Sequence, residues 1–76
     1  MSDTDTRVRE IIAEVSCRDA ATITNETALA DLDFDSLDYF DMAIGIEDQF
    51  DAVLDDTRIL NLTTVQDVID LLAASS

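Results

Sequence analysis

One serine stands among acids in the middle of this sequence, and the neighbouring residue types limit the chemistry that it can do. Ser36 lies in the run DLDFDSLD at positions 31–38, and no Lys, Arg or His occurs between Arg18 and Arg58. A nucleophilic serine needs a base, but the chain contains no His and no Lys, and nearby carboxylates disfavour the alkoxide. No glycine-rich phosphate loop, zinc-ligand spacing or dinucleotide fingerprint occurs either. We therefore expect no catalytic residue, and we interpret Ser36 as a hydroxyl that another protein modifies.

The same acids also suggest a calcium-binding loop, but two positions argue against it. Asp31, Asp33 and Asp35 would take positions 1, 3 and 5 of an EF-hand loop. Position 6 requires Gly and is Ser36, and position 12 requires a bidentate Glu and is Met42. We expect no specific metal site, although the acids should bind divalent ions weakly.

The charge of the chain limits its partners. The 18 Asp and Glu residues oppose 4 Arg, which gives a net charge of -14. Such a field repels nucleic acid and anionic membranes and attracts basic protein surfaces. It also destabilises the folded state by self-repulsion, so we expect stability to rise with salt. Cys17 is the single cysteine, so no disulfide can form within the chain. Because no signal peptide or membrane span is visible either, we expect the protein to be cytoplasmic.

Apolar spacing predicts helices near both ends of what we treat as one small domain, residues 1–76. The i, i+3, i+4, i+7 pattern occurs first at Val8, Ile11, Ile12 and Val15. It returns near the end of the chain at Val65, Val68, Ile69 and Leu72. Asp3 or Thr4 would cap the first of these helices. Thr63 or Thr64 would cap the last.

The middle of the chain predicts a long loop, a helix that begins at Ser36, and a short helix. Periodicity is lost between residues 16 and 34, where we expect a loop held by Ile23, Leu29 and Leu32. A short helical segment is predicted near residues 55–62. The expected fold is a small antiparallel all-α bundle of four helices, three longer and one short, with a long first loop.

The helix predicted from about residue 36 to residue 50 has an inward stripe and a mixed flank. Asp35 would cap it, and Asp38 would complete an arrangement like a capping box. The inward stripe consists of Tyr39, Met42, Ala43, Ile46 and Phe50. The flank beside it consists of Leu37, Phe40 and Ile44 and is bordered by acids, which suits either a solvated face or a docking surface. Gly45 costs this helix about 1 kcal/mol relative to Ala, which indicates close approach of another helix.

Taken alone, Asp35-Ser36-Leu37-Asp38 is an ordinary helix start, but its context resembles acyl carrier proteins. Four segments are similar, in order and spacing, to parts of that family. Residues 7–12 resemble its first helix, and residues 30–32 resemble the approach to its serine. Residues 46–51 resemble the end of its second helix, and residues 62–69 resemble the start of its last helix. By this resemblance, Ser36 would carry a 4'-phosphopantetheine arm. A phosphopantetheinyl transferase holding Mg²⁺ would transfer the arm from coenzyme A, and the terminal thiol would hold an acyl group as a thioester.

The resemblance also implies partners and a place for the cargo. The chain would be a monomer that presents acyl groups to enzymes of fatty-acid, polyketide or related lipid synthesis with basic docking surfaces. The expected partner-binding residues are Asp35, Leu37, Asp38, Asp41, Ile44, Glu47, Asp48 and Asp56. The interior that would shelter the acyl chain is expected to be lined by Leu29, Leu32, Met42, Ile46, Phe50, Leu54, Ile59, Leu62, Val68 and Ile69.

Two departures from the family pattern concern the loops, and two bulky residues bear on specificity. The family usually has Gly where this chain has Asp33, and often has Pro where it has Asp55. Because Asp accepts a positive φ less readily than Gly, the loop before the serine is expected to be set slightly differently. Tyr39 and Phe40 are bulky for the helix that borders the cargo channel, so we expect the channel to have a narrowed mouth and the protein to be a specialised carrier. The usual carrier of fatty-acid synthesis is the alternative.

Two alternatives remain from the sequence. An aminoacyl or peptidyl carrier would work in the same way, but such carriers usually show Gly-Gly before the serine region, and this chain does not. An unmodified acidic adaptor or calcium-buffering protein would not depend on Ser36, and would gain structure or affinity with Ca²⁺.

Overall fold

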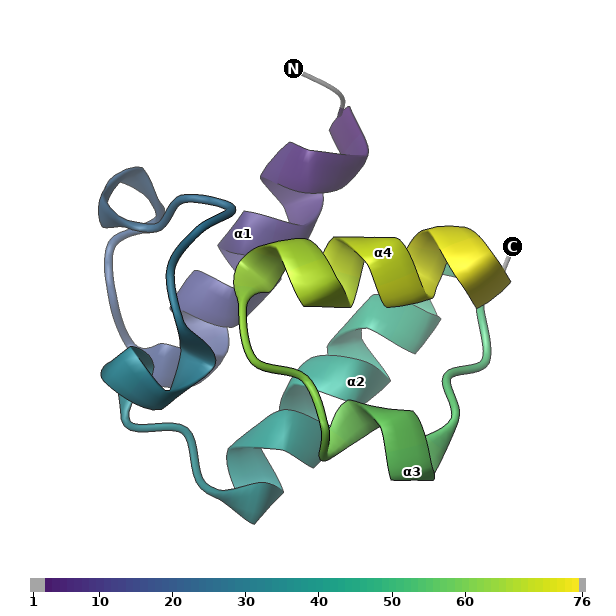
Figure 1. Cartoon of the computed structure of the whole chain (residues 1–76). Coiled ribbons are helices and arrows are strands. Elements are labelled where there is room, and N and C mark those ends of the chain that lie inside the picture. The colour runs from purple at the N-terminus through teal and green to yellow at the C-terminus, as the bar shows by residue number, and fades with distance from the viewer. Residues whose placement is uncertain (1–2, 76) are drawn as a thin grey trace.

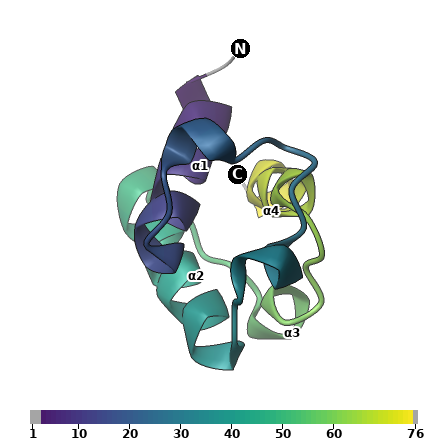
Figure 2. The ribbon, with the colours of Figure 1, turned by 90° about the vertical axis from the view of Figure 1, so that its left-hand side faces the viewer.

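Helices and the loops between them make up the whole of residues 3–75, the part of the chain that the computed structural model describes. The elements follow in the order α1 (Asp3–Ser16), η1 (Ala20–Thr22), η2 (Leu29–Leu32), α2 (Ser36–Phe50), α3 (Asp56–Ile59) and α4 (Val65–Ser75), where η marks a short 3₁₀ helix. Helices α1 and α2 run in opposite directions, and α4 lies across them (Figures 1 and 2). The predicted all-α bundle with three longer helices and one short helix is confirmed.

Side-chain caps fix where the helices begin. Thr64 caps α4, since its Oγ1 accepts from the amide of Asp67 at 3.3 Å and the Asp67 carboxylate accepts from the amide of Thr64 at 3.1 Å. Asp55 caps α3 by accepting from the amide of Thr57 at 2.8 Å, and thus starts the helix where the family often has Pro. Helix α3 is shorter than the predicted segment 55–62.

The start of α1 differs from the expectation. The helix includes Asp3, so Asp3 and Thr4 lie in its first turn and neither is the cap. Their place is still favourable, because acids in the first turn of a helix interact well with the free backbone amides there. No described helix is both long and apolar enough to cross a bilayer.

The core receives residues from every α-helix and from the long loop. The side chains with less than 2% exposure are Ile12, Leu29, Met42, Ile46, Ile59, Val8, Val65 and Val68. Helices α1 and α2 approach closely at Gly45, where an added Cβ would lie 3.1 Å from Cγ2 of Ile11. The prediction that Gly45 permits close approach of a neighbouring helix is therefore confirmed.

The long first loop is held by the core and by backbone pairing. Ile23, Leu29 and Leu32 are buried, as predicted. The loop also pairs with the start of α4 through a β-bridge between Ala28 and Thr64. The amide of Leu29 donates to the carbonyl of residue 63 at 2.8 Å, and the amide of residue 65 donates to that of residue 27 at 3.1 Å. These bonds fix the chain that leads to Ser36.

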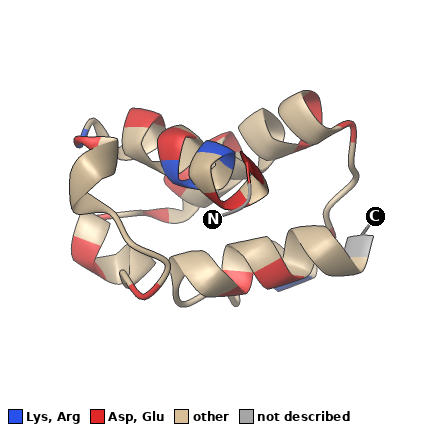
Figure 3. Cartoon of the chain, turned by 90° about the horizontal axis from the view of Figure 1, so that it is seen from above, with Lys and Arg blue, Asp and Glu red and all other residues tan. Residues whose placement is uncertain are grey.

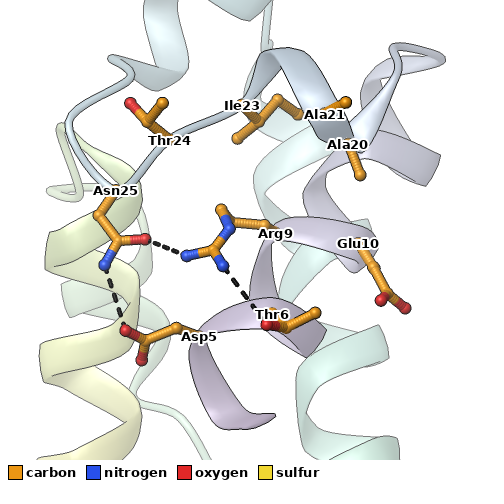
Figure 4. Close-up of a pocket in the computed structure, with 9 residues that line it drawn as sticks. All are labelled: Asp5, Thr6, Arg9, Glu10, Ala20, Ala21, Ile23, Thr24 and Asn25. Atoms are coloured by element: carbon orange, nitrogen blue, oxygen red, sulfur yellow. Dashed lines mark hydrogen bonds between the residues drawn. The ribbon is translucent and has the colours of Figure 1, made fainter. Parts of the chain in front are cut away.

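A network of polar side chains ties the loop to α1 and α4, and we call it the polar clamp: Asp5, Arg9, Asn25 and Gln66. Asn25 accepts from the guanidinium of Arg9 and donates to the carboxylate of Asp5 at 3.2 Å (Figure 4). The same amide group lies 3.2 Å from Oε1 of Gln66. An open pocket of about 510 Å³ lies beside the clamp. The residues that line this pocket come from α1, η1 and the loop after η1, and none of them belongs to α2 (Figure 4).

Candidate modification site at the start of α2

Ser36 is the first residue of α2 and is exposed. Its turn is fixed on both sides: the Asp35 carboxylate accepts from the amide of Asp38 at 2.9 Å, and the Asp38 carboxylate accepts from the amide of Asp35 at 3.2 Å. This is the capping box that the sequence predicts. Within residues 3–75 the hydroxyl of Ser36 makes no hydrogen bond, so it is presented on an ordered turn without being engaged.

The backbone just before this turn takes a left-handed conformation at Asp33. Its φ is 59° and its ψ is 32°, in a region that favours Gly and that Asp enters more readily than most residues. The Asp33 carboxylate lies 3.3 Å from the guanidinium of Arg18, in an exposed ion pair of small energetic value. Asp33 thus adopts the kind of backbone conformation for which Gly is the usual choice.

The exposed side of α2 combines apolar and acidic side chains, and we call it the α2 face: Leu37, Asp41, Ile44 and Asp48. Leu37 is 71% exposed and Ile44 is 63% exposed, although both are large and apolar. Their positions differ by seven, or about two helical turns, which places them on one side of the helix. Asp41 and Asp48 are exposed and make no hydrogen bond or ion pair within the described residues.

The remaining acids of the predicted partner surface differ in what they do within the fold. Asp35 and Asp38 form the capping box, and Glu47 accepts from the amide of Leu54 at 2.8 Å, which holds the loop after α2. Asp56 is exposed in the first turn of α3, which contacts α2. The structural roles of Asp35 and Asp38 follow from their spacing, but no local pattern indicates that of Glu47.

Two exposed apolar residues were not predicted. Val53, in the loop after α2, is 82% exposed, and Leu60 follows α3 and is half exposed. Neither belongs to a periodic segment, so the apolar spacing that identified the core says nothing of them. They add exposed apolar surface shortly before and directly after α3.

Of the two bulky residues that the sequence places beside the cargo, only Tyr39 packs on the core. Tyr39 packs against the core, but its neighbour there is Phe34, whereas Phe40 is only partly buried and is not part of that packing. The ring centroids of Phe34 and Tyr39 are 5.5 Å apart, with an interplanar angle of 78°. The ten residues predicted to line the interior are all in the core or packed against it.

Acids dominate the surface of the described chain, and Figure 3 shows few basic positions between them. Within residues 3–75, no group of three or more Cys, Asp or Glu side chains is placed to hold a metal ion. A phosphoester at Ser36 would lie at a helix N-terminus, which favours negative charge, while the nearby acids oppose it.

A comparison with known protein families finds a match over most of the chain. The model of a family described as "phosphopantetheine attachment site" matches residues 6–72. The match includes Ser36 with the whole of α2 and α3, most of α1 and the greater part of α4.

Proposed function

Because this chain belongs to the family of carrier domains to which 4'-phosphopantetheine is covalently attached, we propose that Ser36 holds the arm and that the protein carries acyl groups. The observation that supports Ser36 is its position: an exposed primary hydroxyl at the start of α2, on a turn fixed by a capping box. The family match covers a region that serves for cofactor attachment, and carriers of this kind are in general not catalytic.

The proposed attachment needs little from this chain beyond a presented hydroxyl. Oγ of Ser36 forms a bond to the phosphorus next to the pantetheine of coenzyme A, and the bond between that phosphorus and the bridging pyrophosphate oxygen breaks. Adenosine 3',5'-bisphosphate leaves, and the transferase accepts the serine proton. The absence of His and Lys from the chain agrees with this division of work.

An acyl cargo is favoured over an aminoacyl or peptidyl cargo by the residues before the serine. The chain lacks the Gly-Gly typical of the latter carriers and has Phe34 and Asp35 immediately before Ser36. Acyl groups would be held on the thiol of the arm as thioesters. The enzymes that use them would belong to fatty-acid, polyketide or related lipid synthesis, in the cytoplasm, where Cys17 stays reduced.

Partner enzymes would dock on the α2 face. Its two apolar side chains are exposed and would supply the contacts that dominate affinity, while Asp41 and Asp48 would orient a basic surface. Asp56 on α3 would extend the acidic region. Asp35, Asp38 and Glu47 would contribute charge while they keep their roles within the fold.

Intact-mass measurement after incubation with coenzyme A, Mg²⁺ and a permissive transferase tests this proposal. The wild-type protein should gain the mass of one phosphopantetheine, and Ser36→Ala should gain none. Ser16→Ala is the matched control, because the hydroxyl of Ser16 donates to the carbonyl of Ile12 at 2.8 Å within α1. It should be modified as wild type. An unmodified wild type, under conditions that modify a reference carrier, would refute the proposal.

A further inference from the structure

The two side chains that flank Ser36 along the chain and also pack on the core are both aromatic. Phe34 lies two residues before Ser36, and Tyr39 lies three residues after it. Both are partly buried against the core, and their rings meet edge to face at 5.5 Å. The contact therefore bridges the turn that carries Ser36, and we call these two residues the aromatic pair.

The backbone holds the aromatic pair in place. The amide of Tyr39 donates to the carbonyl of Asp35 at 3.1 Å, and the capping box fixes the intervening turn. Tyr39 is the first residue of the inward stripe of α2, and Met42, one turn later on that stripe, is fully buried. On the other side, Leu32 precedes Phe34 and is buried in the same core. Along the chain, the two rings are thus flanked on both sides by buried core residues, Leu32 before Phe34 and Met42 after Tyr39.

An apolar chain tethered at Ser36 is stabilised by each methylene group that leaves water, so it will enter the core if a route is open. Protein interiors are close-packed, and a chain that enters must displace side chains. Of the side chains packed on the core, Phe34 and Tyr39 are the nearest to Ser36 along the chain, so they are the ones that a chain entering from Ser36 would displace first. Their mutual contact opposes this, because separating the rings loses an aromatic interaction as well as buried surface.

We propose that the aromatic pair determines cargo specificity by closing the core to long saturated acyl chains, which leaves the cargo outside, beside the rings. The inference rests on the proposed attachment at Ser36. It deepens that proposal by naming the cargo class, which is short acyl groups. It also assigns the narrowing to Phe34 with Tyr39, since Phe40 does not pack on the core.

The test compares acetyl and octanoyl thioesters on the modified protein by their rates of cleavage with hydroxylamine. In wild type the two thioesters should be cleaved at rates within about twofold of each other, because neither is sheltered. In Tyr39→Leu, and in Phe34→Leu, the octanoyl chain should enter the core, so cleavage of its thioester should slow by about fivefold while cleavage of the acetyl thioester is unchanged. A change of about fivefold is the size expected from the loss of one aromatic contact. Phe40→Leu is the matched control and should behave as wild type.

A second measurement needs no variant. In the wild-type protein, the methyl resonances of Met42 and Ile46 should be the same in the acetyl and octanoyl forms, because both residues are fully buried in the core that octanoyl does not enter. Shifted resonances, or octanoyl cleaved much more slowly than acetyl in wild type, would overturn the inference. Equal behaviour of all variants would also overturn it. Failure of the arm to attach is detected separately by mass and would instead defeat the proposed function.

Discussion

The polar clamp and the α2 face both contain Asp side chains but use them for opposite purposes. In the clamp, charged and amide groups from α1, the long loop and α4 satisfy one another. On the α2 face, Asp41 and Asp48 have no partner within the described residues, and apolar side chains are left exposed between them. The difference indicates that polar groups of the first region stabilise the fold, whereas those of the second are free for another protein.

The largest expected effect comes from breaking the clamp. Asn25→Ala removes the amide that joins three segments and leaves Arg9 without that hydrogen bond, so it should destabilise the protein by about 2 kcal/mol. For a domain of this size the melting temperature should fall by about 10 °C. The exposed neighbour Glu26 provides a control, and Glu26→Gln should leave the melting temperature nearly unchanged. Equal melting temperatures for Asn25→Ala and wild type would show that the clamp is not stabilising.

The next largest effect concerns docking and not stability. Ile44→Ala should lower kcat/KM for modification by the transferase by about tenfold, because an exposed apolar side chain at the centre of an interface supplies much of the affinity. Its melting temperature should stay near that of wild type. Gln49→Ala, also exposed on α2, is the control and should be modified normally. If Ile44→Ala destabilises the protein as Asn25→Ala does, the distinction between the two regions is wrong.

A smaller effect is expected at the end of α2. Asp51 has a φ of 52°, a backbone conformation that favours Gly. Its carboxylate also lies at the end of α2, where the helix dipole is negative and a negative charge is unfavourable. Asp51→Gly should stabilise the protein by about 1 kcal/mol, measured by urea unfolding. Asp51→Asn removes only the charge and should show a smaller gain. Since Asp51 is outside the α2 face, kcat/KM for modification should not change with it.

Salt should have the smallest effect, and it should act in opposite directions on stability and on docking. Screening relieves repulsion among the unpaired acids, so the melting temperature should rise by a few degrees at most between low and physiological salt. The same screening should slow association with the basic surface of the transferase. A melting temperature that falls with salt would mean that attractive charge pairs outweigh the repulsion expected from a net charge of -14.

Local spacing predicts most of the fold and part of the site. The capping box at Asp35 and the inward stripe of α2 follow from residues three or four apart, which a helix brings together. The α2 face follows from the same geometry. Each of these features needs only the helical repeat, so the sequence alone is sufficient to predict them.

Features that join distant segments are not predictable in this way. Asn25 and Gln66 are 41 residues apart in sequence, and no periodicity relates them. The contact of Glu47 with the amide of Leu54 depends on how the chain turns after α2. Phe34 becomes the neighbour of Tyr39 only because of the turn between them, and the helical repeat does not extend to Phe34, which precedes α2. Tertiary packing decides all three.

The backbone pairing between the long loop and the start of α4 has a consequence for motion. The amides of residues 29 and 65 and of Gln66 each donate across this junction, at 2.8, 3.1 and 2.8 Å. Because these bonds break together when the loop separates from α4, their hydrogen-exchange rates should fall into one group with a common opening free energy. The segment before Ser36 should then open with the first turn of α4 as one cooperative unit, and not as an independently mobile loop.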